Sequence, residues 1–171
     1  MLSVSEFINI LKQKNYNFEL HKHKPLFTVE ESKKLRGKIK GSHSKNLFFK
    51  NKKNNFFLIS CEESQDINIK KISKSLNLGN ISFAKEEYLL SYLGIKPGSV
   101  SPFALLNNKE NNVSFFLEKK LYESEFINFH PLINEATITM KTSEFVKFMI
   151  ENNKKINIFS STKGVIIKTY E

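Results

Sequence analysis

Two β-rich runs that flank three polar residues constrain the fold of this 171-residue chain most strongly. The runs KNLFFKN (45–51) and NFFLISC (55–61) are separated by KKN. Aromatic and β-branched runs joined by a tight polar turn are typical of a β-hairpin, so we expect a sheet with an antiparallel pair. Cys61, the only cysteine, lies in the second run and is expected to be a small buried hydrophobic residue.

Helical and strand-like segments alternate on both sides of this hairpin. Capping boxes at Ser3 with Glu6 and at Thr28 with Glu31 mark two helix starts, the second helix being short and ending at Gly37. Apolar spacing predicts helices at 4–14, 67–78, 84–93 and 143–152, with Gly79 as the stop of the second of these. Strands are predicted at 17–23, 103–107, 113–118, 136–140 and 156–159. Several strand connections are too short for crossovers, which favours a single α/β domain with a mixed sheet.

The two ends of the chain carry weaker signals. Residues 161–171 are expected to form either an extra strand or a loosely held tail. The N-terminus lacks a basic region followed by an apolar run, and no stretch approaches the ~20 apolar residues of a membrane-spanning helix. We therefore expect a cytoplasmic protein with no membrane partner.

The charge is strongly positive, with a formal net value of +10 and Arg36 as the only arginine among 27 basic residues. A polyanionic partner such as a nucleic acid is one explanation. The same excess of lysine, together with abundant asparagine, isoleucine and phenylalanine, is also what an AT-rich genome would encode in any protein. The charge alone leaves both explanations open.

Common catalytic motifs do not occur in this sequence. It contains no Walker loop, G-x-G-x-x-G, H-E-x-x-H or G-x-S-x-G. Of the four histidines, His21 and His23 alternate in a way that could place both on one strand face, but a third metal ligand at suitable spacing is missing. We therefore expect solvated or packing histidines and no metal site.

Three segments combine polar residues with glycine or proline in a way typical of loops at a site. Residues 41–48 (GSHSKNLF) place Lys45 and Asn46 where a polar loop enters an apolar strand. Residues 96–103 (KPGSVSPF) contain Gly98 and Pro102, a combination that can aim backbone N–H groups at a carbonyl oxygen. Residues 130–137 (HPLINEAT) are polar and kinked. Taken singly, each also has an ordinary structural explanation as a strand end, a turn or a connection.

Five ordered blocks of sequence resemble the YbaK/prolyl-tRNA synthetase-associated (INS-like) editing domain family. They are residues 23–37 (HKPLFTVEESKKLRG), 43–48 (HSKNLF), 82–87 (SFAKEE), 93–107 (LGIKPGSVSPFALLN) and 130–137 (HPLINEAT). Within that family they look most like the free-standing alanyl-tRNA(Pro) deacylases of the PrdX or ProXp-ala type. The resemblance covers about residues 1–160, which we expect to be the editing domain, and leaves 161–171 outside.

The resemblance implies a fold, an activity and a set of site residues. Family members are single α/β domains with a mixed, strongly curved sheet and flanking helices, and they remove a wrong amino acid from tRNA without metal or cofactor. The implied partners are the acceptor end of tRNA(Pro) and, as a further candidate, prolyl-tRNA synthetase. The implied catalytic residues are Lys45, Gly98, Ser99 and His130, and the implied substrate-binding residues are Phe27, Thr28, Leu35, Asn46 and Pro102.

One block departs from the family pattern, and two other functions compete with the first. The family's P-G-G-H reads K-G-S-H at 40–43, which changes the loop that leads to Lys45. A cysteinyl-tRNA(Pro) deacylase would have the same fold and lysine. A non-catalytic tRNA-binding or regulatory module would keep the fold but would not need Lys45 or the glycine loop. The residues in the blocks at 93–107 and 130–137 favour the alanine-specific type.

Overall fold

The computed structural model describes residues 1–25, 31, 34 and 38–171. The helical elements are α1 (Val4–Gln13), α3 (Ile69–Ser75), α4 (Glu86–Tyr88), a π-helical turn (Leu89–Leu93), a 3₁₀ helix (Pro102–Asn107), α5 (Lys119–Tyr122) and α6 (Thr142–Glu151). The strands are β1 (Phe18–Lys22), β2 (Ser42–Asn51), β3 (Phe56–Glu62), β4 (Ile81–Phe83), β5 (Val113–Glu118), β6 (Phe126–Phe129), β7 (Ala136–Lys141), β8 (Ile156–Ser160) and β9 (Val165–Tyr170).

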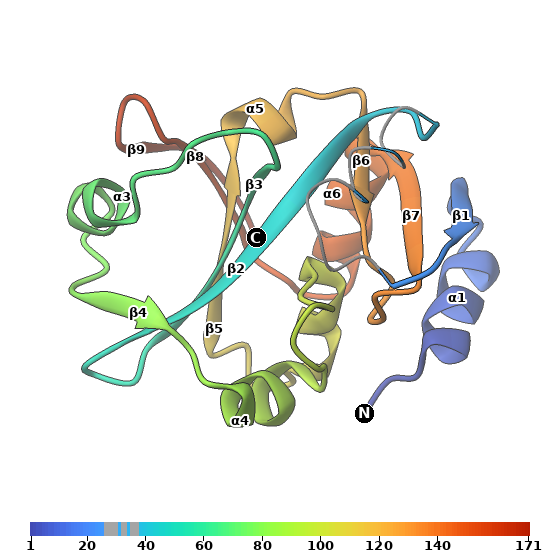
Figure 1. The fold of residues 1–171 in the computed structure, drawn as a ribbon, viewed down its shortest axis with the longest axis horizontal. Coiled ribbons are helices and arrows are strands. Elements are labelled where there is room, and N and C mark those ends of the chain that lie inside the picture. The colour runs from blue at the N-terminus through green and yellow to red at the C-terminus, as the bar shows by residue number, and fades with distance from the viewer. Residues whose placement is uncertain (26–30, 32–33, 35–37) are drawn as a thin grey trace.

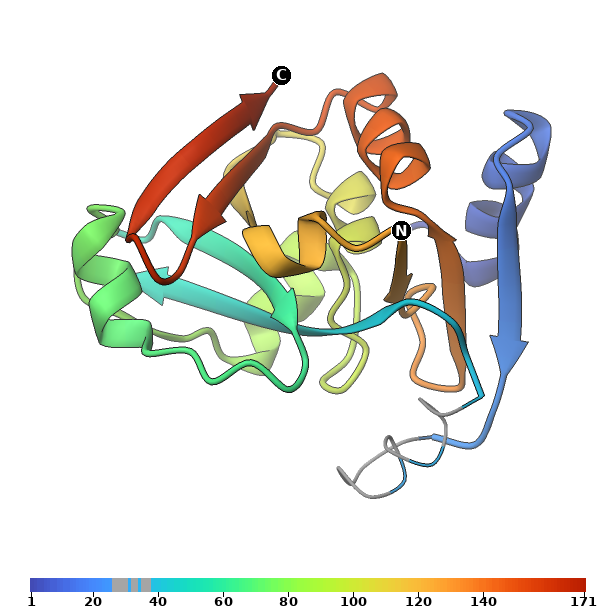
Figure 2. The same cartoon turned by 90° about the horizontal axis from the view of Figure 1, so that it is seen from above.

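Within the described residues all strands join one mixed sheet in the order β1-β7-β6-β2-β3-β5-β8-β9, with β4 paired to β2. The β2–β6, β3–β5 and β5–β8 pairs are parallel, and the other pairs are antiparallel. The long strand β2 links the two halves of the sheet, because its start pairs with β6 and its remainder with β3 and β4 (Figure 1). Figure 2 shows β1 and α1 at the opposite end of the molecule from the β8–β9 hairpin.

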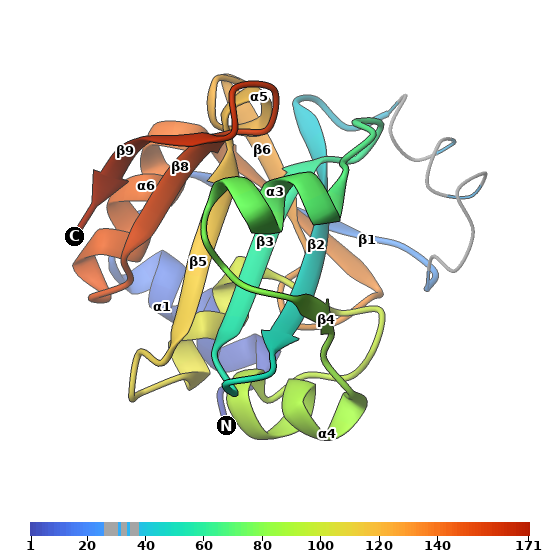
Figure 3. The ribbon, with the colours of Figure 1, turned by 90° about the vertical axis from the view of Figure 1, so that its left-hand side faces the viewer.

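Each face of the sheet has its own hydrophobic cluster. The larger cluster packs α1, α6 and the 3₁₀ helix against one face, with Phe7 and Phe103 at a centroid distance of 4.7 Å. The smaller cluster packs α3 through Ile72 against the other face, where α3 lies in front of β2 and β3 in Figure 3. Full burial of such side chains stabilises the fold by about 1.5–3 kcal/mol each. Phe48 belongs to the larger cluster and Phe49 to the smaller one, as the alternation of a strand requires.

Most of the predicted elements are present. The helix at the N-terminus begins with the predicted capping box, in which Ser3 accepts from the N–H of Glu6 and Glu6 accepts from the N–H of Ser3. The hairpin is confirmed, with Lys45 opposite Cys61 and Phe49 opposite Phe57. The mixed α/β sheet with flanking helices is also confirmed. The extra-strand alternative holds for the C-terminal residues, since β9 pairs with β8.

One predicted element was wrong and another was predicted too long. Residues 103–107 form a 3₁₀ helix and not a strand, because Ser101 caps its first turn and Pro102 occupies the first helical position. Residues 102–106 are all buried. Their apolar run is unbroken, so it has no periodicity that would distinguish a helix from a strand. The helix predicted at 67–78 ends at Ser75, because Asn77 has φ of 54° and stops it before Gly79.

Some elements were not predicted or cannot be compared. The strands β4 and β6 are short, with three and four residues, and gave no clear alternation in the sequence. The short helix predicted between Thr28 and Gly37 lies outside the described residues. Within the described part of the chain, no helix combines the length and apolarity needed to cross a membrane.

Candidate active site

The path of the chain into β2 is fixed by Gly41 and Asn128. Gly41 has φ of 86°, and a Cβ atom there would lie 2.6 Å from the Cβ and carbonyl oxygen of Phe126, so only glycine fits. The Asn128 amide donates to the carbonyl oxygens of Lys40 and Ser42 at 2.9 and 3.2 Å. The loop KGSH therefore keeps the one glycine that its close approach to β6 requires, and the preceding proline of the family pattern is not needed for it.

Lys45 lies in the first half of β2, on the sheet face that carries the smaller hydrophobic cluster. Its neighbour across the hairpin is Cys61, which is fully buried, and burial raises the pKa of this thiol to about 12. The thiol is therefore neutral at physiological pH. The Lys45 ammonium donates a hydrogen bond to the main-chain oxygen of Gln65, in the loop that follows β3. An ammonium has three donors, so this bond leaves capacity for a substrate oxygen.

His130 follows β6 and is held by the start of β7. Its Nδ1 donates to the carbonyl oxygen of Ala136 at 2.8 Å. Burial lowers the pKa of His130, and the nearby imidazole of His23 lowers it further, whereas the Ala136 bond and the carboxylates of Glu63 and Glu135 act in the opposite direction. The folded protein therefore favours a neutral His130 with its lone pair on Nε2, which suits a hydrogen-bond acceptor or a general base.

The parallel pairing of β2 with β6 brings the segment before Lys45 beside the segment before His130. The ladder aligns Ser42 with Ile127 and His43 with Asn128. Beyond His43 the regular ladder ends, and the Ser44 hydroxyl donates to the Asn128 carbonyl at 2.8 Å. Lys45 and His130 therefore each follow the last aligned pair of these two strands by two residues.

The glycine loop reaches this region through the segment that follows His130. Gly98 has φ of 85°, and a Cβ atom there would lie 3.4 Å from the side-chain nitrogen of Asn134. Ser99 is buried, and its N–H closes the turn by donating to Lys96 at 3.1 Å. Pro102 is buried at the first position of the 3₁₀ helix. The loop thus has the positive φ that the sequence suggested, and Ser99 holds its shape.

The opposing segment also carries an unusual backbone. Leu132 has φ of 70°, a region that a leucine rarely adopts, and its side chain is buried in the larger cluster. Strained residues of this kind persist where packing holds them and are frequent at functional sites. The kink predicted between the strands in HPLINEAT is therefore present.

The remaining predicted residues are placed differently or not described. Asn46 points to the face of β2 opposite to Lys45, where its amide donates to Ser44 at 3.1 Å and its oxygen accepts from Ser60 at 2.6 Å. Phe27, Thr28 and Leu35 lie outside the described residues.

Sequence reasoning did not single out His23 as part of the site. Its Nδ1 donates to Lys24 at 2.8 Å, its Nε2 lies 2.9 Å from the hydroxyl of Thr137, and its ring lies 6.3 Å from the ring of His130. The signals for it in the sequence were its alternation with His21 and its place at the head of the block 23–37. Among the described residues, no group of three or more His, Cys, Asp or Glu side chains is arranged to hold a metal ion.

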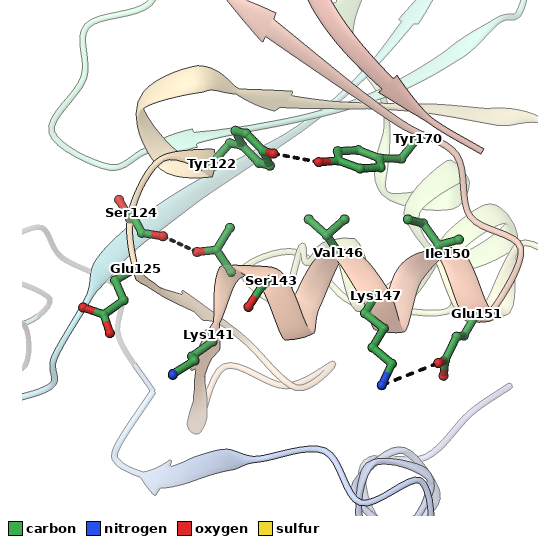
Figure 4. A pocket seen from close by; sticks show the side chains of 11 residues that line it. Tyr122, Ser124, Glu125, Lys141, Ser143, Val146, Lys147, Ile150, Glu151 and Tyr170 are labelled. Atoms are coloured by element: carbon green, nitrogen blue, oxygen red, sulfur yellow. Dashed lines mark hydrogen bonds and ion pairs between the residues drawn. The ribbon is translucent and has the colours of Figure 1, made fainter.

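A pocket of about 750 Å³ lies elsewhere, between α6 and the end of β9 (Figure 4). Tyr122 and Tyr170 form its roof through a hydroxyl pair at 2.7 Å, and Val146 and Ile150 form part of its floor. None of the residues predicted for the site lines this pocket. The pocket and the predicted site residues therefore lie at different places on the molecule.

Comparison with known proteins gives a consistent set of relatives. The sequence matches the aminoacyl-tRNA editing domain family over residues 23–148. It is 38% identical over 132 residues to the Xenopus laevis prolyl-tRNA synthetase associated domain-containing protein 1, covering 74% of this chain and 78% of that one. It is 29% identical over 143 residues to the prolyl-tRNA editing protein ProX of Acetoanaerobium sticklandii, covering 83% and 87%.

A solved structure shares the fold. The crystal structure of a proposed trans-editing enzyme for prolyl-tRNA synthetase superposes with a TM-score of 0.66 at 15% identity, covering 91% of this chain and 96% of that one. The match over residues 23–148 includes Lys45, Gly98 and His130. This chain belongs to the aminoacyl-tRNA editing domain family.

Proposed function

We propose that this protein hydrolyses mischarged tRNA and that its main substrate is alanyl-tRNA(Pro). The placement of Lys45 and His130 just beyond the last aligned pair of β2 and β6 carries the proposal, because it brings a positive charge and a neutral imidazole to the same end of these two strands. The family match and the names of the relatives, which refer to prolyl-tRNA editing and to prolyl-tRNA synthetase, support tRNA(Pro) as the RNA. A net charge of +10 suits a polyanionic substrate.

In the reaction, water adds to the ester carbonyl, the bond between that carbon and the ribose oxygen breaks, and alanine and tRNA leave. Lys45 neutralises a phosphate or the ester oxygen as negative charge develops. The Nε2 of His130 orients water or a ribose hydroxyl by accepting its hydrogen bond. The substrate's own ribose hydroxyl takes part in activating the water, so that the protein supplies position and charge.

The loop at Gly98 and the residues around it give shape to the acyl end of the site. The positive φ of Gly98 lets the main chain approach the carbonyl closely, and Ser99 and Pro102 hold the loop in place. Asn46 contributes indirectly by tying β2 to β3 through Ser60. We assign the walls that exclude residues larger than alanine to Phe27, Thr28 and Leu35.

One assay separates this function from its alternatives. The protein is incubated with alanyl-, cysteinyl- and prolyl-tRNA(Pro), and release of each amino acid is followed. We expect fast release of alanine and little release of proline, because a small pocket rejects the larger pyrrolidine ring. Faster release of cysteine than alanine would assign the protein as a cysteinyl-tRNA(Pro) deacylase. Tight tRNA binding without release of any amino acid would make it a binding module.

A further inference from the structure

Glu118, a buried acidic residue with no role in the proposed mechanism, lies in line with Lys45 across three strands. The register pairs Lys45 of β2 with Cys61 of β3, and Ser60 of β3 with Leu117 of β5. One residue further along these parallel strands, Cys61 is beside Glu118. Side chains in register share a face of the sheet, so Lys45, Cys61 and Glu118 form a row on one side. Glu118 is only 3% exposed.

A chain of hydrogen bonds joins Glu118 to Lys45 over this row. The Ser161 hydroxyl and N–H both donate to one Glu118 oxygen, at 2.8 and 3.1 Å, and the N–H of Lys120 donates to the other at 2.6 Å. The same Ser161 hydroxyl accepts from the side-chain nitrogen of Gln65 at 2.9 Å. The main-chain oxygen of Gln65 in turn accepts from the Lys45 ammonium.

The polarity of these bonds is consistent from end to end. A buried carboxylate accepts only, so Ser161 must donate to Glu118 and is left to accept from Gln65. Gln65 is thereby held by its side chain while its carbonyl oxygen is presented to Lys45. A buried charge is tolerated only when donors surround it, and Glu118 has three.

We propose that Gln65 and Ser161, anchored by the buried carboxylate of Glu118, are positioning residues that hold the Lys45 ammonium in its working place. A lysine side chain is flexible and carries about 2 kcal/mol of rotamer entropy, so a fixed acceptor is needed to aim it. A displacement of a catalytic group by about 1 Å can remove a large part of its contribution to the reaction rate. The inference rests on the proposed function of Lys45 and assigns its support to groups far away in the sequence.

The proposal gives the C-terminal segment a part in the site. Ser161 lies between β8 and β9, outside the region 23–148 that matches the family. The β8–β9 hairpin packs beside β5, and Glu118 of β5 is in register with Phe159 of β8. Removing the hairpin would therefore remove both the hydroxyl that holds Gln65 and two of the three donors to Glu118.

The first experiment is a double-mutant cycle on single-turnover hydrolysis of alanyl-tRNA(Pro) at saturating protein. We expect Gln65→Ala and Ser161→Ala each to lower the rate roughly tenfold with an unchanged half-saturating concentration. The double variant should be no slower than either single variant, because both break the same link. Ser161→Thr keeps the hydroxyl and should restore the rate. Thr162→Ala, an exposed neighbour in the same turn, is the matched control and should equal the wild type.

The second experiment tests whether Gln65 and Ser161 hold the Lys45 side chain in place, and it does not depend on a measurement of activity. The rate at which an amine-specific acylating reagent modifies Lys45 is measured by peptide mass spectrometry in the same folded variants, with Lys52 as the internal reference. We expect Gln65→Ala and Ser161→Ala to speed modification of Lys45 severalfold, and Ser161→Thr and Thr162→Ala to leave it unchanged. Unchanged modification of Lys45 in folded Gln65→Ala and Ser161→Ala proteins would overturn the proposal. Altered modification in a protein with no deacylase activity would instead uphold the support of Lys45 and refute the proposed function.

Discussion

The Nδ1 atom of His130 lies 2.8 Å from the carbonyl oxygen of Ala136. A carbonyl oxygen can only accept, so the proton sits on Nδ1 and the lone pair of the neutral ring sits on Nε2. Burial and the neighbouring His23 lower the pKa of His130 below its ordinary value of 6.5. The main-chain bond selects the tautomer, and burial keeps the ring neutral, which together define a group that can accept a proton from water or from a ribose hydroxyl.

This neutral state predicts the pH dependence of the reaction. The lone pair on Nε2 is lost only when the ring is protonated, so the acid limb of the pH–rate profile for alanyl-tRNA(Pro) hydrolysis should lie below pH 6.5. The limb should disappear in His130→Gln, whose residual rate should be lower throughout. A wild-type limb above that pH, still assigned to His130 by its absence in the variant, would contradict the neutral imidazole.

The same pKa shift predicts how stability depends on pH. His130 takes up a proton more readily in the unfolded chain than in the folded one, so the unfolded state is favoured as pH falls below 6.5. Its contribution to the free energy of unfolding is therefore fully present above that pH and is lost below it. Urea unfolding at about pH 7 and about pH 5.5 should show a larger loss in the wild type than in His130→Gln. Equal losses would show that His130 titrates alike in both states.

Replacement of Lys45 by alanine should abolish most of the activity and leave the fold intact. The side chain makes one hydrogen bond to Gln65, whereas its charge is needed where negative charge develops on the substrate. We expect a loss of about 100-fold or more in kcat/KM with a melting temperature close to that of the wild type. Lys52→Ala, which removes an exposed lysine in the β2–β3 turn, is the control for charge alone. A folded Lys45→Ala protein with near-normal turnover would refute the assignment.

Gly98→Val should lower activity more than its effect on stability explains. The φ of 85° at Gly98 disfavours a β-branched residue, and the new side chain would also press against Asn134. Gly79→Val introduces comparable strain at φ of 76° in the connection between α3 and β4, where the added Cβ would meet only Asn51 at 3.7 Å. Each variant should lose about 1–3 kcal/mol of stability, but only Gly98→Val should lose most of its deacylase rate. Similar rates in the two variants would mean that the loop is only a connection.

Affinity for tRNA should fall steeply with salt. Lysine contacts with phosphates release bound cations, so the logarithm of the affinity should fall by about 0.7–0.9 for each contact per tenfold rise in salt concentration. Filter binding of uncharged tRNA(Pro) at several salt concentrations measures this slope. A flat response would show that the net charge of +10 reflects composition and not a binding surface.

The local order of the chain was largely readable from its sequence. Three features depend on residues within a few positions of each other: the Ser3–Glu6 capping box, the β2–β3 hairpin and the apolar stripe of α6. Their patterns can therefore be recognised in the sequence without knowledge of the fold. The prediction failed at 103–107, because a run buried on every side has no polar face to reveal its period. The blocks of family resemblance identified Lys45, Gly98 and His130 as candidates. Sequence similarity alone, however, does not give the distances between these residues in space.

The tertiary structure decided how these candidates are related. The pairing of β2 with β6 brings His43 beside Asn128, 85 positions away in the sequence, and with them the segments that lead to Lys45 and His130. The support of Lys45 by Gln65, Ser161 and Glu118 joins residues that are up to 96 positions apart in a single hydrogen bond. Such contacts form because buried polar groups must be paired with whatever donors the folded chain brings near, and no local pattern in the sequence records that choice.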